Sequence, residues 1–170
     1  MTYAPVESGS NVVIFGAGPI GLAAVQGARS HSAGQIIVVE PIAYRRQKAV
    51  DLGATTGCDP NVDTDTLVQR IRELCYGPTD RFDAGGRYGP GYRYGGADFV
   101  IEGSGGDLFP PAVEAGPDPT GLLAIRQAWD VTTGGGHLTL LGGGQRGEIS
   151  FPTQQFCLST RSIHAGQMGG

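Results

Sequence analysis

The sequence has few charged residues and no long hydrophobic run. Charged residues make up 16% of the 170 positions, and 16 acidic against 12 basic residues give a net charge of −4. No general positive field therefore favours a nucleic acid as partner. No apolar run approaches the roughly 20 residues that cross a bilayer, and no charged and then apolar leader opens the chain. We expect a soluble, cytoplasmic protein that binds neither membrane nor nucleic acid.

Candidate metal ligands are scarce and scattered. The three cysteines, at 58, 75 and 157, match neither a disulfide framework nor the close spacing of a zinc site. The three histidines stand far apart in the sequence, so each is expected to be isolated: His31, His137 and His164. The sequence thus predicts reduced thiols, no metal site and no catalytic residue within this chain.

Glycine and proline are abundant instead, with 30 and 11 residues. Most of them fall between apolar segments, where glycine and proline are typical of turns. Two stretches, 81–96 and 103–121, break this alternation and are predicted to be long loops of one domain spanning 1–170. The first interleaves arginine and tyrosine with glycine, a composition that can stack on RNA bases. Because the chain has an acidic net charge, we expect this stretch to be a surface or interface element rather than an RNA-binding one.

Apolar runs and amphipathic segments alternate along the chain. Six runs predict strands: 11–15, 35–39, 55–58, 97–101, 137–141 and 162–165. Four amphipathic segments predict helices: 19–30, 44–52, 65–75 and 122–131. The apolar face of the first helix is assigned to Ile20, Ala23, Ala24 and Ala28. This order predicts an α/β fold, a doubly wound parallel sheet of about six strands with helices on both faces.

A glycine motif, GAGPIG at 16–21, stands between the first strand and the first helix. Gly16 can make the tight turn, Gly18 lets the backbone approach a pyrophosphate, and Gly21 lets the helix lie close to the strand. The free N–H groups and the positive dipole end of the helix then hold the diphosphate. This placement is typical of the dinucleotide-binding Rossmann fold.

An acidic residue follows the motif at the spacing that this fold requires. Glu40 ends the second predicted strand, nineteen residues after Gly21. A carboxylate there accepts the ribose hydroxyls of the adenosine and repels a 2′-phosphate, which favours NAD over NADP. Arg45 and Arg46 keep NADP open, because a nearby arginine can accommodate the 2′-phosphate.

Four blocks of sequence now carry a resemblance: GSNVVIFGAGPIGLAA, VVEPIAYRRQKAVDLGA, GADFVIEGSGG and GGGHLTLLGGG. With them, residues 9–170 resemble the cofactor-binding domain of the zinc-dependent medium-chain dehydrogenase/reductase family, in its alcohol and formaldehyde dehydrogenase branch. The resemblance covers nearly all of this chain and about half of such an enzyme.

The resemblance implies a set of cofactor contacts along this chain. It places the pyrophosphate at Gly18, Pro19 and Ile20, and the adenine ribose at Glu40 with support from Arg45. The segment 102–105, with Ser104, would line the path from adenosine to nicotinamide. The carboxamide of the nicotinamide would meet backbone groups of Leu141, Gly142 and Gly143.

The function implied is that of the NAD-binding domain of a zinc-type alcohol or aldehyde dehydrogenase, which positions the nicotinamide for hydride transfer to or from an alcohol carbon. Zinc and the substrate would be held by a catalytic domain absent from this chain, so the domain is expected to be inactive alone. Homo-oligomers would form through the sheet edge near 151–165. A non-catalytic NAD-binding or sensing module is the alternative, since the motif reports binding and not turnover.

Overall fold

The computed structural model describes residues 6–61, 67–75, 95–104, 122–142 and 147–166. The predicted loop 81–96 lies outside these ranges apart from its last two residues, and so does most of the loop 103–121. The first two residues of the predicted helix 65–75 and the expected cofactor contact Gly143 also lie outside them.

In the described ranges, strands and helices alternate as the sequence predicts. The strands are β1 (Asn11–Phe15), β2 (Gln35–Val39), β3 (Thr56–Cys58), β4 (Ala97–Glu102), β5 (Thr132–Leu140) and β6 (Ser162–Ala165). The helices are α1 (Pro19–Ser30), α2 (Ala43–Leu52), α3 (Leu67–Leu74), α4 (Leu123–Val131) and α5 (Thr153–Leu158).

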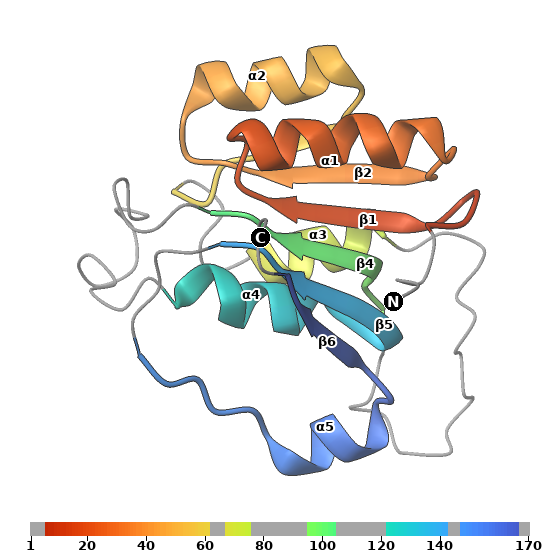
Figure 1. Cartoon of the computed structure of the whole chain (residues 1–170), viewed down its shortest axis with the longest axis vertical. Coiled ribbons are helices and arrows are strands. Elements are labelled where there is room, and N and C mark those ends of the chain that lie inside the picture. The colour runs from red at the N-terminus through yellow and green to blue at the C-terminus, as the bar shows by residue number, and fades with distance from the viewer. Residues whose placement is uncertain (1–5, 62–66, 76–94, 105–121, 143–146, 167–170) are drawn as a thin grey trace.

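All six strands run parallel in one sheet of order β3-β2-β1-β4-β5-β6 (Figure 1). The chain builds outward from β1 to β3, then crosses to β4 on the other side of β1 and builds outward again. The predicted doubly wound parallel sheet is confirmed. Its topological switch point lies between β1 and β4, and in such sheets ligands bind outside the carboxyl ends of the strands at this point.

Each face of the sheet has its own apolar core. One cluster joins Val12 and Ile14 of β1 to residues of α1 and α2, and the other joins Val13 and Phe15 to α3 and α4. The two clusters form because successive side chains of β1 point to opposite faces of the sheet. Every β1 residue from Val12 to Phe15 is buried, as expected of a central parallel strand.

The face of α1 that packs on the sheet differs from the prediction. Gly21, Val25 and Ala28 are buried, whereas Ala23 is exposed and Ile20 is only half-buried. Val25 and Ala28 follow Gly21 at i+4 and i+7, so the buried stripe of α1 begins at the last glycine of the motif. Of the four predicted residues, Ala28 is thus confirmed as buried, whereas Gly21 and Val25 take the places expected for Ile20 and Ala23.

The fifth strand begins earlier than predicted. Thr132 already pairs with Ala97 of β4, and the ladder resumes with His137 opposite Phe99 after a register shift. Glycines allow this irregular stretch, because Gly135 has φ +75° and a Cβ on Gly136 would lie 2.9 Å from a methyl of Thr132. The sequence alone predicts this strand only from residue 137 onward.

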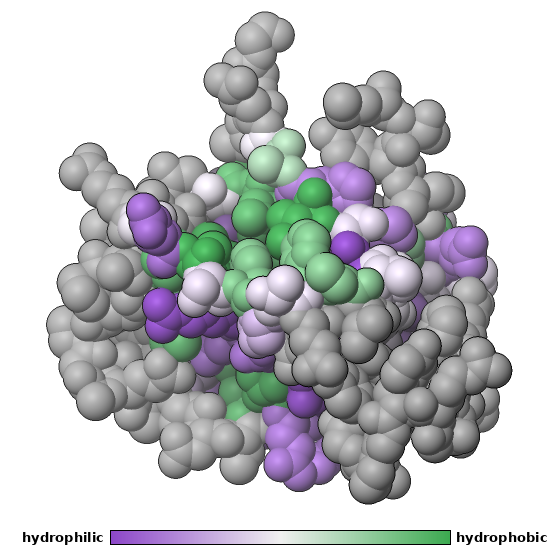
Figure 2. Space-filling view, turned by 90° about the horizontal axis from the view of Figure 1, so that it is seen from below, coloured by the Kyte–Doolittle hydropathy of each residue, from purple (hydrophilic) through white to green (hydrophobic). Residues whose placement is uncertain are grey.

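The short helix α5 was not predicted. It lies at the lower side of the molecule in Figure 1, and the view from below shows hydrophobic residues gathered at the centre of that face (Figure 2). Phe156 of α5 stacks on Trp129 of α4 with ring centroids 5.7 Å apart, and Phe151 contacts the same indole. The guanidinium of Arg161 lies 4.6 Å from that ring. Aromatic packing on one tryptophan therefore holds the segment in place.

Candidate functional site

The glycine turn lies at the carboxyl end of β1, at the switch point of the sheet. Gly16 has φ +94°, a left-handed conformation that favours glycine. Its N–H donates to the carbonyl of Val39 at 2.8 Å, and a Cβ here would lie 3.1 Å from the carbonyl oxygen of Gly103. The turn thus fits between the ends of β2 and β4, where a side chain would be both strained and crowded.

The start of α1 offers backbone donors beside open space. Pro19 is the first residue of the helix, Gly18 caps it with no side-chain hydrogen bond, and the first turn has no acidic residue. A Cβ on Gly18 would meet nothing within 4 Å. A helix N-terminus with this access is suited to an anionic group. A Cβ on Gly21, in contrast, would lie 1.9 Å from the carbonyl oxygen of Gly16, so Gly21 is needed for packing.

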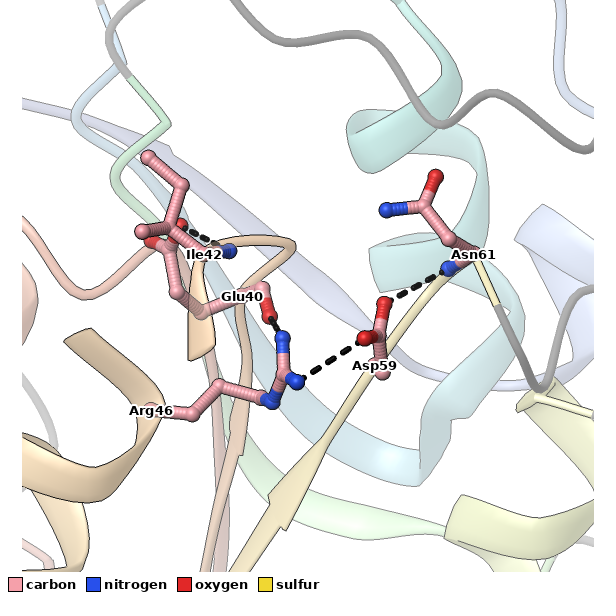
Figure 3. Close-up of polar contacts among 5 residues, drawn as sticks. All are labelled: Glu40, Ile42, Arg46, Asp59 and Asn61. Carbon is pink, nitrogen blue, oxygen red and sulfur yellow. Dashed lines mark hydrogen bonds and ion pairs between the residues drawn. The ribbon is translucent and has the colours of Figure 1, made fainter. Parts of the chain in front are cut away.

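Glu40 is tied directly to the glycine turn. It follows β2, is only 4% exposed, and its Oε2 accepts a hydrogen bond from the N–H of Ala17 at 2.7 Å. Oε1 accepts from the N–H of Ile42 at 3.0 Å (Figure 3). The sequence indicated a ribose-binding acid but gave no sign of this second role. A carboxylate has about four acceptor sites, and these two bonds occupy two of them.

The two arginines after Glu40 differ in what they contact. Arg46 donates to the backbone carbonyl of Glu40 at 2.6 Å and forms an ion pair with Asp59 at 2.8 Å (Figure 3). Arg45 is half-buried and donates to the hydroxyl of Tyr44, a hydrogen bond that raises the pKa of its guanidinium. Arg46 therefore makes a structural contact between Glu40 and Asp59, whereas the hydrogen bond of Arg45 is to Tyr44, which is exposed.

A second buried carboxylate lies across the switch point from Glu40. Glu102 ends β4 with 0% exposure and pairs in register with Phe15 and Leu140. Its Oε1 accepts the backbone N–H of Ser104 at 2.9 Å and also the Ser104 hydroxyl. Ser104, a predicted cofactor contact, is thereby held beside the glycine turn. The sequence places Glu102 only as part of the segment 102–105 that lines the cofactor path, and its bond to Ser104 is an addition from the structure.

The backbone of Glu102 also fixes the loop after β5. Its carbonyl oxygen accepts the N–H of Leu141 at 2.7 Å and that of Gly142 at 3.0 Å. These two predicted nicotinamide contacts therefore use their N–H groups within the protein. Backbone carbonyls are what they can offer to a carboxamide NH2 group.

The histidines are not all isolated, and this corrects the sequence analysis. Nδ1 of His137 lies 3.4 Å from Nε2 of His164, because β5 and β6 are neighbours in the sheet. Burial lowers the pKa of His137, and the nearby His164 lowers it further. His31 lies elsewhere, at the end of α1. Sequence separation could not reveal the pair, since pairing of these strands depends on the whole topology.

Within the described ranges, no three side chains among His, Cys, Asp and Glu form a group that could hold a metal ion. The same ranges include no helix long and apolar enough to cross a membrane. The polar groups that do converge are the glycine turn, Glu40, Ser104 and the backbone after β5. They meet at the carboxyl end of the sheet, beside the switch point where sheets of this kind bind ligands.

Comparison with known proteins gives one family match. The model of a family described as zinc-binding dehydrogenase matches residues 19–116, more than half of the chain. An NDMA-dependent alcohol dehydrogenase of Amycolatopsis methanolica is 39% identical over 72 residues, which are 42% of this chain and 19% of that protein. The matching part thus spans about a fifth of the relative's length.

Solved structures share the fold over almost the whole chain. Benzyl alcohol dehydrogenase of Acinetobacter calcoaceticus superposes with a TM-score of 0.68 at 23% identity, covering 95% of this chain and 35% of that one. A zinc-binding dehydrogenase of Sinorhizobium meliloti 1021, in a structure bound to NADP, has a TM-score of 0.64 at 25% identity, covering 94% and 38%. In both comparisons this chain corresponds to little more than a third of the length of the solved protein.

Proposed function

Since the chain belongs to the zinc-binding dehydrogenase family, we propose that it is the domain that binds NAD in an alcohol or aldehyde dehydrogenase. The observation that carries the proposal is the bond between Glu40 and Ala17, which joins the acid after β2 to the glycine turn. One rigid unit then presents the two groups that a dinucleotide needs, a diphosphate cradle and a ribose acceptor.

The diphosphate would be bound at the start of α1. The space beside Gly18 admits its oxygens, and Pro19 and Ile20 begin the helix whose N-terminal dipole stabilises negative charge. Gly16 and Gly21 contribute by letting the turn and the helix lie close together. No cationic side chain is required for this binding mode.

The adenosine end would be read by Glu40. Its two remaining acceptor sites match the two ribose hydroxyls of NAD, whereas a 2′-phosphate would place a dianion against a buried carboxylate. Arg46, which pairs with Asp59, is not available to neutralise that phosphate without breaking the pair. NAD is therefore the preferred cofactor, although the Sinorhizobium meliloti relative was solved with NADP.

The nicotinamide end would lie past the switch point. Ser104, which is held by Glu102, would lie beside the path. The backbone carbonyls of Leu141 and Gly142, whose N–H groups are bonded to Glu102, would accept from the carboxamide, and Gly143, which lies outside the described residues, is proposed as a further contact. These contacts would fix the ring so that one face is open to a substrate carbon. Bound NAD supplies hydride acceptance and donation at this ring.

The domain's share of the reaction is thus binding and orientation. The zinc that the family description implies has no ligand group of three among the described residues, so we assign it to residues outside them. The alcohol or aldehyde substrate is a property of the complete enzyme. A second copy of the chain is proposed as partner, through the sheet edge near 151–165 where β6 lies.

Calorimetric titration of the chain with NAD, NADH and NADP tests the proposal. We expect one site per chain that prefers NAD to NADP and is lost in Gly18→Val. A variant at an exposed position remote from the site, Gln26→Ala on α1, is the matched control. Absence of saturable NAD binding, or equal NAD affinity in Gly18→Val, would contradict the assignment.

A further inference from the structure

Two histidines lie diagonally across the neighbouring strands β5 and β6. His137 is in register with Ser162, and Thr139 is in register with His164. Side chains two apart on a strand share a face. His137 and His164, called the histidine pair below, therefore occupy one face of the sheet together with the hydroxyls of Thr139 and Ser162.

The imidazole of His137 is held in a stack of rings. Phe99 of β4 stacks on it with a centroid distance of 5.2 Å and an interplanar angle of 15°. His164 lies on the other strand at 5.6 Å and 30°. Residues of three adjacent strands thus orient the rings. Because the imidazoles are already ordered, binding of a ligand costs little further side-chain entropy. Both histidines are half-buried, so solvent ions can reach them.

The spacing of the two nitrogens is informative. Nδ1 of His137 and Nε2 of His164 are 3.4 Å apart. This is longer than the roughly 2.7–3.2 Å of a normal N–H hydrogen bond. Two imidazole nitrogens at about 2.0–2.1 Å from one tetrahedral metal ion would be separated by about 3.3 Å. At 3.4 Å the two rings share a long hydrogen bond, and a metal ion that replaces its proton would find both nitrogens already at the separation of two ligands.

We infer that the histidine pair binds a divalent transition-metal ion of the imidazole-preferring class, with Nδ1 of His137 and Nε2 of His164 as its two protein ligands. Cu²⁺, Ni²⁺ and Zn²⁺ belong to this class, and Cu²⁺ binds most tightly by the usual order. Water completes the coordination, because the described residues give no group of three candidate ligands. A site with two protein ligands binds reversibly, and a chelator removes the ion.

Binding has a structural consequence at the sheet edge. β6 is the last strand of the sheet and pairs only with β5 in the described topology. An ion shared by one residue from each strand connects them, and an ion that binds the folded state stabilises it by mass action. The metal therefore raises the melting temperature through β6.

The full chain, carrying Cys157→Ser to remove an exposed thiol and stripped with EDTA, is titrated with Cu²⁺ and Ni²⁺. Calorimetry gives stoichiometry and affinity, and electron paramagnetic resonance of the Cu²⁺ form reports nitrogen ligands. We expect one ion per chain, hyperfine structure from two imidazole nitrogens, and a higher melting temperature with Ni²⁺.

Single variants identify the ligands. His137→Phe keeps a ring against Phe99, and His164→Gln keeps a polar side chain, and each should weaken binding at least tenfold. His31→Gln, at the end of α1, is the matched control and should bind normally. Unchanged affinity in either pair variant, loss only in the His31 control, or no binding by the parent chain at millimolar metal would overturn the site. Should a variant fail to fold, a parent Cu²⁺ spectrum with fewer than two nitrogens overturns it equally.

Discussion

The Oε2 oxygen of Glu40 lies 2.7 Å from the backbone nitrogen of Ala17, so the acid that ends β2 is bonded to the glycine turn that ends β1. The bond is buried, and buried polar groups of this kind are costly to leave unpaired. The positions of the proposed ribose acceptor and the proposed diphosphate cradle are thus coupled. Changes at either one are expected to affect the other.

Replacing Glu40 should weaken NAD binding and loosen the turn together. Glu40→Ala removes acceptors from the N–H groups of Ala17 and Ile42 as well as from the ribose. We expect a loss of about 1–3 kcal/mol in NAD affinity, the size of a charged hydrogen bond. Calorimetry with NAD and NADP measures it.

Glu40→Gln separates the two effects. The amide oxygen can still accept from Ala17, but the negative charge that repels a 2′-phosphate is gone. Discrimination against NADP should therefore fall while the melting temperature stays nearer to that of the parent. Equal or tighter NADP binding by the unaltered chain would reverse the cofactor assignment, and Arg45 would become the candidate 2′-phosphate contact.

The second and third glycines of the motif should respond differently to a side chain. A Cβ on Gly18 meets nothing within 4 Å, so Gly18→Val should fold and yet fail to bind NAD, because the side chain fills the phosphate space. Gly21→Ala places a methyl 1.9 Å from the Gly16 carbonyl and should lose about 1–3 kcal/mol of stability or more. Circular dichroism melts and NAD titration compare the pair. Normal binding by folded Gly18→Val would mean that the cradle is elsewhere.

Much of the fold could be predicted because its signals are local. The buried run at 11–15, the glycine motif and the acid at 40 occupy one stretch of chain, and their spacing determines their geometry. The family resemblance, carried by the same blocks, is confirmed by the match to the zinc-binding dehydrogenases. Helix α5 was not predicted, because its six residues are too few to show a helical repeat of apolar positions. Its contacts with Trp129, which is distant in sequence, hold it in place.

Two of the contacts that sequence reasoning missed depend on long-range strand pairing. Glu102 contacts Ser104 nearby, but its carbonyl meets Leu141 only because β4 and β5 are neighbours. His137 and His164 are 27 residues apart and meet only through the pairing of β5 with β6. No periodicity within one segment encodes such contacts. They follow from the sheet order.

The three cysteines should differ sharply in reactivity. Burial, reinforced by Asp98 and Cys58, raises the pKa of Cys75 to about 12, so almost none of it is thiolate at pH 8. Cys58 is 1% exposed, whereas Cys157 is exposed on α5. Brief iodoacetamide treatment followed by mass spectrometry should label Cys157 first and the other two only after denaturation. Rapid labelling of Cys75 in the native chain would contradict its placement in the core.

The proposed second copy should pair along the outer edge of β6, and one backbone change can test this without disturbing the core. The N–H of Gly166 donates inward to the carbonyl of Leu140, so by alternation the N–H of Ala165 points away from β5. Ala165→Pro removes that outward donor and blocks edge pairing, since proline cannot donate to a ladder. A charge at Ile163 would be less informative, because that side chain packs against the core.

Light scattering should find a dimer for the parent chain and for the control Ala165→Ser, and a monomer for Ala165→Pro. Unchanged far-ultraviolet circular dichroism would show that the sheet itself is intact. A parent chain that is monomeric at high concentration, or a proline variant that stays dimeric, would move the contact away from this edge. Because β3 is the other edge of the sheet, it would then be the next candidate surface for pairing.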